Sequence, residues 1–235
     1  MLFRSQAETE PIIPKDSEWK YLDTGTKLDK VDWPALEYDD SGWKSGKAEL
    51  GYGDGDEATA VDRGPDPSTK FHTTIYFRKE FQMGESDEKS MFIKLLRDDG
   101  AVVYLNGEEL LRSNMRSGTI RYSSYTSKRN SSKDSRVFFP YFLETPKFIN
   151  GRNVFAVEVH RGSRYDKDLS FNFEASIMDS SGTPVLIDKT STIIVRAKSG
   201  ETWSAPSTAS IVISPSAALK VTELMYNPAD GKTFE

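Results

Sequence analysis

Apolar and polar residues alternate with a period of two along several stretches of the chain, whereas the 3.6-residue period of an amphipathic helix is nearly absent. In 169–177, for example, Leu169, Phe171 and Phe173 are separated by single polar residues. Such alternation is typical of a strand that has one face in a core and the other in solvent. Similar runs predict further strands at 74–81, 90–96, 101–106, 137–143 and 153–160.

Turn-forming residues separate these runs and predict how the strands connect. Asn106-Gly107 is a preferred sequence for a two-residue hairpin loop, because both positions must adopt positive φ. Gly, Asn, Asp and Pro also recur between the other runs. Short strands with turns between them indicate an all-β fold, a jelly-roll β-sandwich.

Composition excludes several classes of function. The chain has 235 residues and a formal net charge of −5, so no nucleic-acid partner is expected. It contains no cysteine, which excludes disulfides, cysteine-ligated metals and thiol nucleophiles. His72 and His160 are the two histidines, and they are not in a local metal-binding motif. No apolar run approaches the length of a membrane span, so we expect no insertion into a membrane. The sequence has no long amphipathic pattern or unusual apolar patch, so we expect a monomer.

Both ends of the chain suggest a piece of a longer protein. The first residues contain no apolar stretch of the length of a signal peptide, and the last residues stop just after a turn at 227–231. The composition becomes polar near residue 179. The predicted organisation is a tail at 1–15, a jelly roll at 16–179, a connector with two strands at 180–214 and a truncated module at 215–235.

Five motifs follow one another between residues 16 and 179. They are WKYLDTG at 19–25, YDDSGW at 38–43, YFRKEF at 76–81, DDGAVVYLNG at 98–107 and GRNVFAVEVH at 151–160. In this order they resemble the galactose-binding-like jelly roll, and they are similar to the sugar-binding domain at the start of many β-galactosidase-type glycosidases. The resemblance implies a jelly-roll fold and a role in sugar recognition.

Two shorter resemblances lie in the C-terminal part. The sequence VTELMYNP at 221–228 is similar to the opening strand of a lamin-tail domain, and 190–213 is similar to the last strands of fibronectin-type or chitobiase-tail modules. This order of modules resembles large exported bacterial proteins. It implies an extracellular or cell-surface location.

Carboxylates gather in and after the glycine-rich segment 53–57. Asp54, Asp56 and Asp62 offer hard oxygen ligands, which calcium prefers. The spacing differs from that of an EF-hand loop, and a solvated acidic loop is the alternative interpretation. The resemblance adds support for calcium, because jelly rolls of this family often hold a structural calcium ion, and leaves the solvated loop as an open alternative.

The segment 119–136 is rich in serine and basic residues and carries Tyr122 and Tyr125. Aromatic faces beside cationic groups suit a sugar ring or an anionic glycan, and also single-stranded nucleic acid. A solvated loop without a ligand is the remaining alternative. The acidic balance of the chain disfavours nucleic acid, and the family's use of rim loops favours a glycan.

A polar cluster is expected at the end of the predicted strand 153–160 and in the loop that follows. Glu158 and His160 share one face of this strand, so we expect the carboxylate to hold the imidazole. The predicted sugar contacts are His160, Arg161 and Asp168 for hydrogen bonds and Tyr52 or Tyr165 for stacking, together with Tyr122 and Tyr125.

No catalytic motif is evident. The pairs Asp39-Asp40 and Asp98-Asp99 are expected to serve turns, since adjacent carboxylates on a strand point to opposite faces and cannot form the acid pair of a glycosidase. Nucleophile-elbow, phosphate-loop and zinc-protease motifs do not occur. The predicted function is a non-catalytic module of a larger exported protein, either carbohydrate-binding or a structural and adhesive spacer. The alternative is an accessory domain of a glycoside hydrolase whose catalytic domain is absent from this chain.

Overall fold

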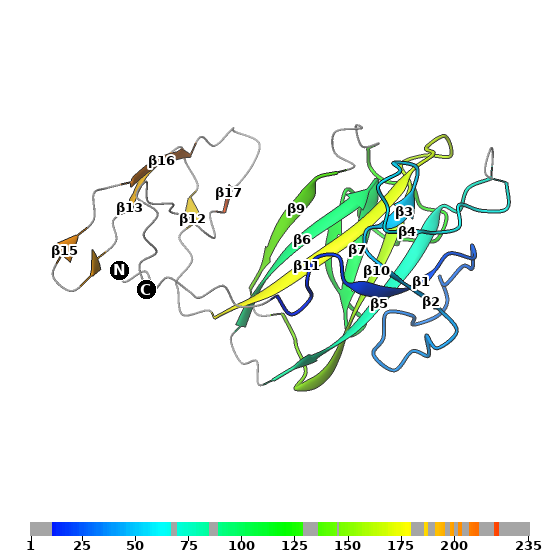
Figure 1. Cartoon of the computed structure of the whole chain (residues 1–235), viewed down its shortest axis with the longest axis horizontal. Coiled ribbons are helices and arrows are strands. Elements are labelled where there is room, and N and C mark those ends of the chain that lie inside the picture. The colour runs from blue at the N-terminus through cyan, green and yellow to red at the C-terminus, as the bar shows by residue number, and fades with distance from the viewer. Residues whose placement is uncertain are drawn as a thin grey trace. The chain divides into compact units, whose positions relative to one another are not determined.

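The computed structural model describes residues 11–66, 70–84, 89–128, 136–144 and 146–179, and the backbone of short strands between 186 and 220 (Figure 1). The chain divides into two compact units. One comprises Glu10–Asp179, and the other comprises Met1–Thr9 with Ser180–Glu235. Each unit is described by itself.

The unit Glu10–Asp179 is a β-sandwich of two sheets, which confirms the predicted all-β jelly-roll class (Figure 1). The first sheet has the order β2 (Lys44–Lys47), β1 (Glu18–Leu22), β5 (Thr74–Met83), β10 (Gly151–His160), β7 (Gly100–Leu105) and β8 (Glu108–Ser113). The second has the order β4 (Thr59–Ala60), β3 (Leu50–Tyr52), β11 (Leu169–Asp179), β6 (Lys89–Asp98) and β9 (Phe138–Leu143). Neighbouring strands are antiparallel except β3 and β4.

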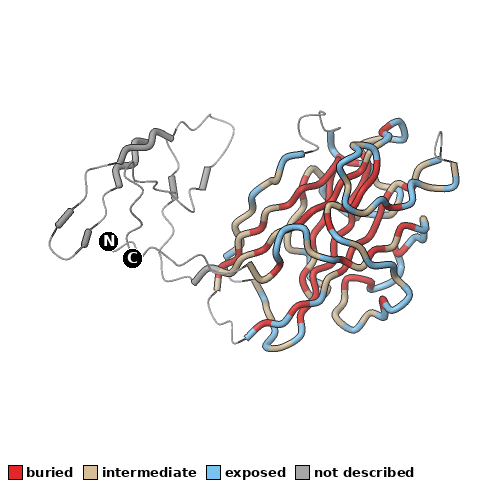
Figure 2. Tube along the Cα trace, viewed as in Figure 1, coloured by how far each residue is buried: buried red, intermediate tan, exposed pale blue. Residues whose placement is uncertain are grey.

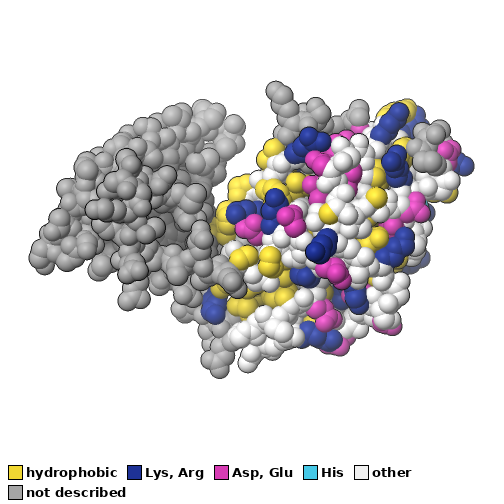
Figure 3. All heavy atoms as spheres, viewed as in Figure 1, with side chains coloured by type: hydrophobic (Ala, Val, Ile, Leu, Met, Phe, Trp, Pro, Cys, Tyr) yellow, Lys and Arg dark blue, Asp and Glu magenta, His cyan; other side chains and the backbone are white. Residues whose placement is uncertain are grey.

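The core lies between the two sheets, and buried residues run along the central strands of both (Figure 2). Phe77 of β5 stacks on Phe171 of β11 with ring centroids 4.3 Å apart, and Trp19 of β1 meets the same ring edge-on at 5.0 Å. Such aromatic pairs contribute beyond the apolar area they bury. Some hydrophobic side chains remain at the surface over β6 and β9 (Figure 3).

The six strands predicted from alternation are all present, with ends that differ by only a few residues. The predicted hairpin is confirmed, because Asn106 and Gly107 adopt φ of 51° and 93° between β7 and β8. The prediction that the polar residues of β11 face solvent is only partly correct. Ser170 and Asn172 are buried, and the Asn172 side-chain amide donates to Asp16 at 2.6 Å.

A second apolar cluster covers the outer face of the first sheet, and the strand pattern did not predict it. Trp33, from the segment between β1 and β2, packs on Tyr76 and Tyr104 with centroids 4.8 and 5.6 Å apart. Fully buried Arg78 anchors this segment, since its Nε donates to Asp40 Oδ2 at 2.8 Å and its Nη1 donates to the Trp33 carbonyl at 2.5 Å. Both faces of this sheet are therefore covered in its central part.

In the second unit the structure describes three strand pairs. They are β12 (Leu186–Ile187) with β17 (Leu219–Lys220), β13 (Ser191–Val195) with β16 (Ser207–Ile211), and β14 (Lys198–Ser199) with β15 (Thr202–Trp203). The lamin-tail resemblance at 221–228 lies outside the described residues. Among the described residues, the structure contains no helix with the length and apolar character needed to cross a membrane.

Candidate functional site

Two loop segments lie together where β10 ends, and we call residues 114–128 and 161–167 the rim. The Thr126 amide donates to the Arg161 carbonyl at 3.2 Å, which joins the two segments directly. Asn114, at φ 57°, accepts from the Ser127 amide at 2.9 Å and donates through its side chain to the Asp99 carbonyl at 2.8 Å. The rim is therefore tied to itself and to the β6–β7 turn by backbone and side-chain hydrogen bonds.

A buried polar chain supports the rim from the outer face of the first sheet. His160 is fully buried, and its Nε2 lies 3.0 Å from Oε2 of Glu158. Oε1 of Glu158 accepts from the Tyr104 hydroxyl at 2.7 Å, and burial together with this carboxylate raises the pKa of Tyr104. On its other side, His160 Nδ1 lies 2.9 Å from both Thr74 Oγ1 and the Ser124 carbonyl. The predicted contact between Glu158 and His160 is confirmed. Because His160 is fully buried, it holds the Ser124 segment of the rim in place and does not face solvent.

Arg161, at the start of the second rim segment, and Tyr52 of β3 are both buried. Arg161 is 1% exposed, packs its guanidinium 4.9 Å from the ring of Phe71 and donates from Nη2 to the Ser163 carbonyl at 3.0 Å. Tyr52 stacks on the same Phe71 ring, with the two ring centroids 6.0 Å apart. Burial raises the pKa of Tyr52 to about 12. A ring 2% exposed offers no face to a ligand, so Tyr165 is the better of the two predicted stacking residues.

Two tyrosines and one arginine of the rim are exposed near one another. Tyr165 is 66% exposed and Tyr125 is 38% exposed. The guanidinium of Arg164 lies 4.7 Å from the Tyr165 ring and donates to its hydroxyl, and this hydrogen bond raises the pKa of Arg164, with a smaller contribution from Tyr125. We call Tyr125, Arg164 and Tyr165 the platform. Arg164 was not among the residues predicted from sequence, although an Arg-Tyr pair in a polar loop could have indicated it.

Tyr122 connects the rim to the segment between β1 and β2. Its amide donates to Asp29 Oδ1 at 2.6 Å, and its carbonyl accepts from Thr74 Oγ1 at 2.6 Å. Its half-buried hydroxyl lies 3.5 Å from His72 Nδ1, and burial raises the tyrosine pKa and lowers that of His72. Of the two tyrosines predicted in this loop, only Tyr125 projects into solvent.

The acidic loop next to the rim is held by its own hydrogen bonds. The Glu57 carboxylate accepts from the amides of Asp54 and Gly55 at 2.9 Å each. Burial, and then the carboxylates of Asp168 and Asp56, raise the pKa of Asp54. Asp56 pairs with Arg136 at 3.1 Å.

The structure does not bring the three predicted calcium ligands together. Asp62 lies apart from Asp54 and Asp56, accepting from the Gly64 amide at 2.8 Å while its own amide donates to Asp23 at 2.7 Å. Within the described ranges, no three His, Cys, Asp or Glu side chains are grouped so that they could hold a metal ion. The calcium site stays a prediction, and the proposals below do not depend on it.

Of the paired aspartates, Asp39 serves a turn as predicted, whereas the Asp40 carboxylate pairs with Arg78 and Lys20. Asp39 Oδ1 accepts from the Ser41 amide at 2.9 Å, and hydrogen bonds with Ser41 lower the pKa of Asp39. Asp99, which is 3% exposed, accepts from the Gly162 amide at 2.5 Å. A Cβ on Gly162 would lie 2.8 Å from that carboxylate, so a larger residue there would make the Asp99 side chain shift.

Comparisons with known proteins give fold-level likeness only. No family model matches the chain, and no curated protein matches it. A β-glycosidase from Bacteroides vulgatus has a TM-score of 0.45 and 14% identity, covering 79% of this chain and 22% of that one. A glycoside hydrolase family 2 β-glucuronidase has a TM-score of 0.43 and 16% identity, covering 92% of this chain and 27% of that one. A β-glucuronidase from an uncultured Clostridium sp. has a TM-score of 0.44 and 14% identity, covering 85% of this chain and 33% of that one. The chain thus spans between 22% and 33% of the length of these structures.

Proposed function

We propose that the unit Glu10–Asp179 is a non-catalytic carbohydrate-binding module of a larger protein, and that it binds sugar on the platform. The observation that carries this proposal is the exposure of Tyr125 and Tyr165 beside Arg164, on loops fixed by the buried Glu158–His160 chain. The apolar face of a sugar ring packs on a tyrosine ring, and a guanidinium donates to its hydroxyl oxygens. Fixed loops reduce the entropy lost on binding.

Two carboxylates next to the rim are held in loop-forming hydrogen bonds, which favours a non-catalytic role. A glycosidase needs two carboxyl groups that face the scissile bond from opposite sides, one as acid and one as base or nucleophile. Here Asp99 is buried and accepts from the Gly162 amide, and Asp29 accepts from the amide of Tyr122. Both are committed to holding loops.

An accessory domain of a glycoside hydrolase is the second candidate, and the motifs shared with glycosidase sugar-binding domains favour it. The two readings differ in what the parent protein contains. A catalytic barrel in the same polypeptide would support the accessory domain. A completed lamin-tail domain followed by further β-modules would support an exported binding or adhesive protein at the cell surface.

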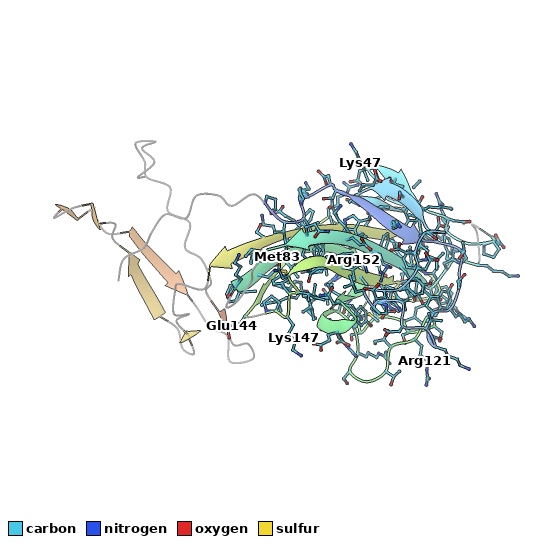
Figure 4. The ribbon with its side chains drawn as sticks, turned by 90° about the horizontal axis from the view of Figure 1, so that it is seen from below. Lys47, Met83, Arg121, Glu144, Lys147 and Arg152 are labelled. Atoms are coloured by element: carbon cyan, nitrogen blue, oxygen red, sulfur yellow. The ribbon has the colours of Figure 1, made fainter. Side chains whose placement is uncertain are left out.

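The test is binding of the full chain to a glycan array, followed by calorimetry on any ligand found. Tyr165→Ala and Tyr125→Ala should each weaken binding by at least about tenfold. Ile149→Ala is the matched control, because Ile149 is 46% exposed and follows Lys147, which lies at the opposite end of the sandwich from Arg121 of the rim (Figure 4). Absence of any glycan binding, or equal losses in all three variants, would overturn the proposal.

A further inference from the structure

Exposed cations are concentrated on the rim. Its two segments carry five exposed basic side chains, which are Arg116, Arg121, Lys128, Arg164 and Lys167. The acidic residue within the same segments is Asp166, and it is 3% exposed. The solvent-facing charge of the rim is therefore positive, although the whole chain has a net charge of −5.

Several basic side chains elsewhere in the described structure have carboxylate partners, unlike these five cations. Arg112 pairs with Glu109 at 2.5 Å, and Arg152 pairs with Glu37 at 2.6 Å. Among the described residues, none of the five rim cations has a carboxylate within ion-pair distance. Their charge is free to meet a ligand.

Carboxylates on elements next to the rim are partly committed. Asp29 accepts from the Tyr122 amide at 2.6 Å, and Asp62 accepts from the Gly64 amide at 2.8 Å. Asp168 is half-buried and packs closely against Gly53, since a Cβ added to Gly53 would lie 2.7 Å from the Cβ of Asp168. Asp168 and Asp54 give the rim one acidic border, so an anionic ligand should lie over Tyr165 and toward Arg164 and Arg121.

Resting on the proposed function, we propose that the glycan is acidic and carries carboxylate or sulfate groups. A sugar ring on Tyr165 would place its charged substituent beside Arg164, whose guanidinium has five donors, one of which contacts the Tyr165 hydroxyl. Guanidinium groups bind carboxylates and sulfates through paired, charge-assisted hydrogen bonds. A glycan is favoured over single-stranded nucleic acid, because a nucleic-acid site needs several successive stacking faces along a basic groove.

The experiment compares ligands that share a sugar backbone and differ in charge. The full chain is titrated with an oligogalacturonide and its methyl ester, and with dextran sulfate and dextran. We expect at least about tenfold tighter binding of an acidic member than of its neutral counterpart at low salt, with the preference shrinking as salt rises. Arg164→Gln should reduce the preference to near equality, whereas Arg152→Gln, on an exposed arginine with a partner, should keep it.

Three outcomes would overturn the inference in distinguishable ways. Equal, Tyr165-dependent binding of acidic and neutral members would overturn the charge preference and leave the proposed function intact. Absence of binding to every glycan would overturn both. Tighter binding of single-stranded oligonucleotides than of any glycan would replace both with a nucleic-acid site. Unchanged thermal melting of Arg164→Gln would show that the variant is folded, as expected for an exposed side chain.

Discussion

Nε2 of His160 lies 3.0 Å from Oε2 of Glu158, on the face of β10 that points away from the core between the sheets, and neither side chain is open to solvent. A buried carboxylate needs partners, because desolvation without hydrogen bonds costs free energy. Glu158 has two, His160 and the hydroxyl of Tyr104. This series of polar contacts connects the outer face of the first sheet to the Ser124 carbonyl of the rim.

Glu158→Gln should lower the free energy of unfolding by about 1–3 kcal/mol, because it replaces a buried carboxylate that accepts from the Tyr104 hydroxyl and lies beside His160 with an amide. Chemical denaturation at neutral pH measures this change. Glu108→Gln is the control. Its ion pair with Lys147 is well exposed, and its removal should change stability by less than about 1 kcal/mol. Equal effects of the two changes would contradict the structural role of the buried chain.

Arg78→Met should destabilise the protein by about 3–5 kcal/mol, since it removes one of the two cationic partners of buried Asp40 and leaves the Trp33 carbonyl without its donor. Trp33 stacks near Trp43, so tryptophan fluorescence should shift to longer wavelength as the segment loosens. An unchanged spectrum and melting curve would show that Arg78 does not anchor this segment.

Acid should weaken the same anchor. Burial acts to raise the pKa of Asp40, but hydrogen bonds and charges from Lys20 and Arg78 outweigh it and lower the pKa below 3.8. The folded pKa is thus below the unfolded one, so the contribution of Asp40 is complete above about pH 4 and is lost as the pH falls through the folded pKa. Asp40→Asn should flatten the decline of unfolding free energy in this acidic range. An identical pH profile in wild type and variant would refute the assignment.

Asp54 should behave in the opposite sense. Burial and the neighbouring carboxylates of Asp168 and Asp56 raise its pKa above 3.8, so its ionisation disfavours the folded state as the pH rises through that window. Asp54→Asn should therefore raise the melting temperature at pH 7 and leave it unchanged at pH 3. A lower melting temperature at pH 7 would mean that the charge has a stabilising partner, as a bound calcium ion would provide.

The strands and the β7–β8 hairpin could be predicted from sequence because alternation and Asn-Gly turns are local signals. Burial of the outer face of the first sheet could not be predicted from sequence. Trp33 lies in a segment without strand periodicity, and only the folded chain brings it against Tyr76. The same limit applies to the site. Tyr52 and Tyr165 have the same chemistry in the sequence, and only the packing of Phe71 on Tyr52 shows which one faces solvent.

The most direct test of the platform is nuclear magnetic resonance on the full chain with isotope-labelled tyrosine rings. The chain contains 10 tyrosines, of which Tyr125 and Tyr165 are exposed on the rim while Tyr52 is buried and Tyr104 donates to Glu158. Titration with neutral and acidic oligosaccharides should move the ring signals of Tyr125 and Tyr165 and leave that of Tyr52 in place. Signals that never move with any glycan, or shifts confined to tyrosines away from the rim, would contradict binding on this platform.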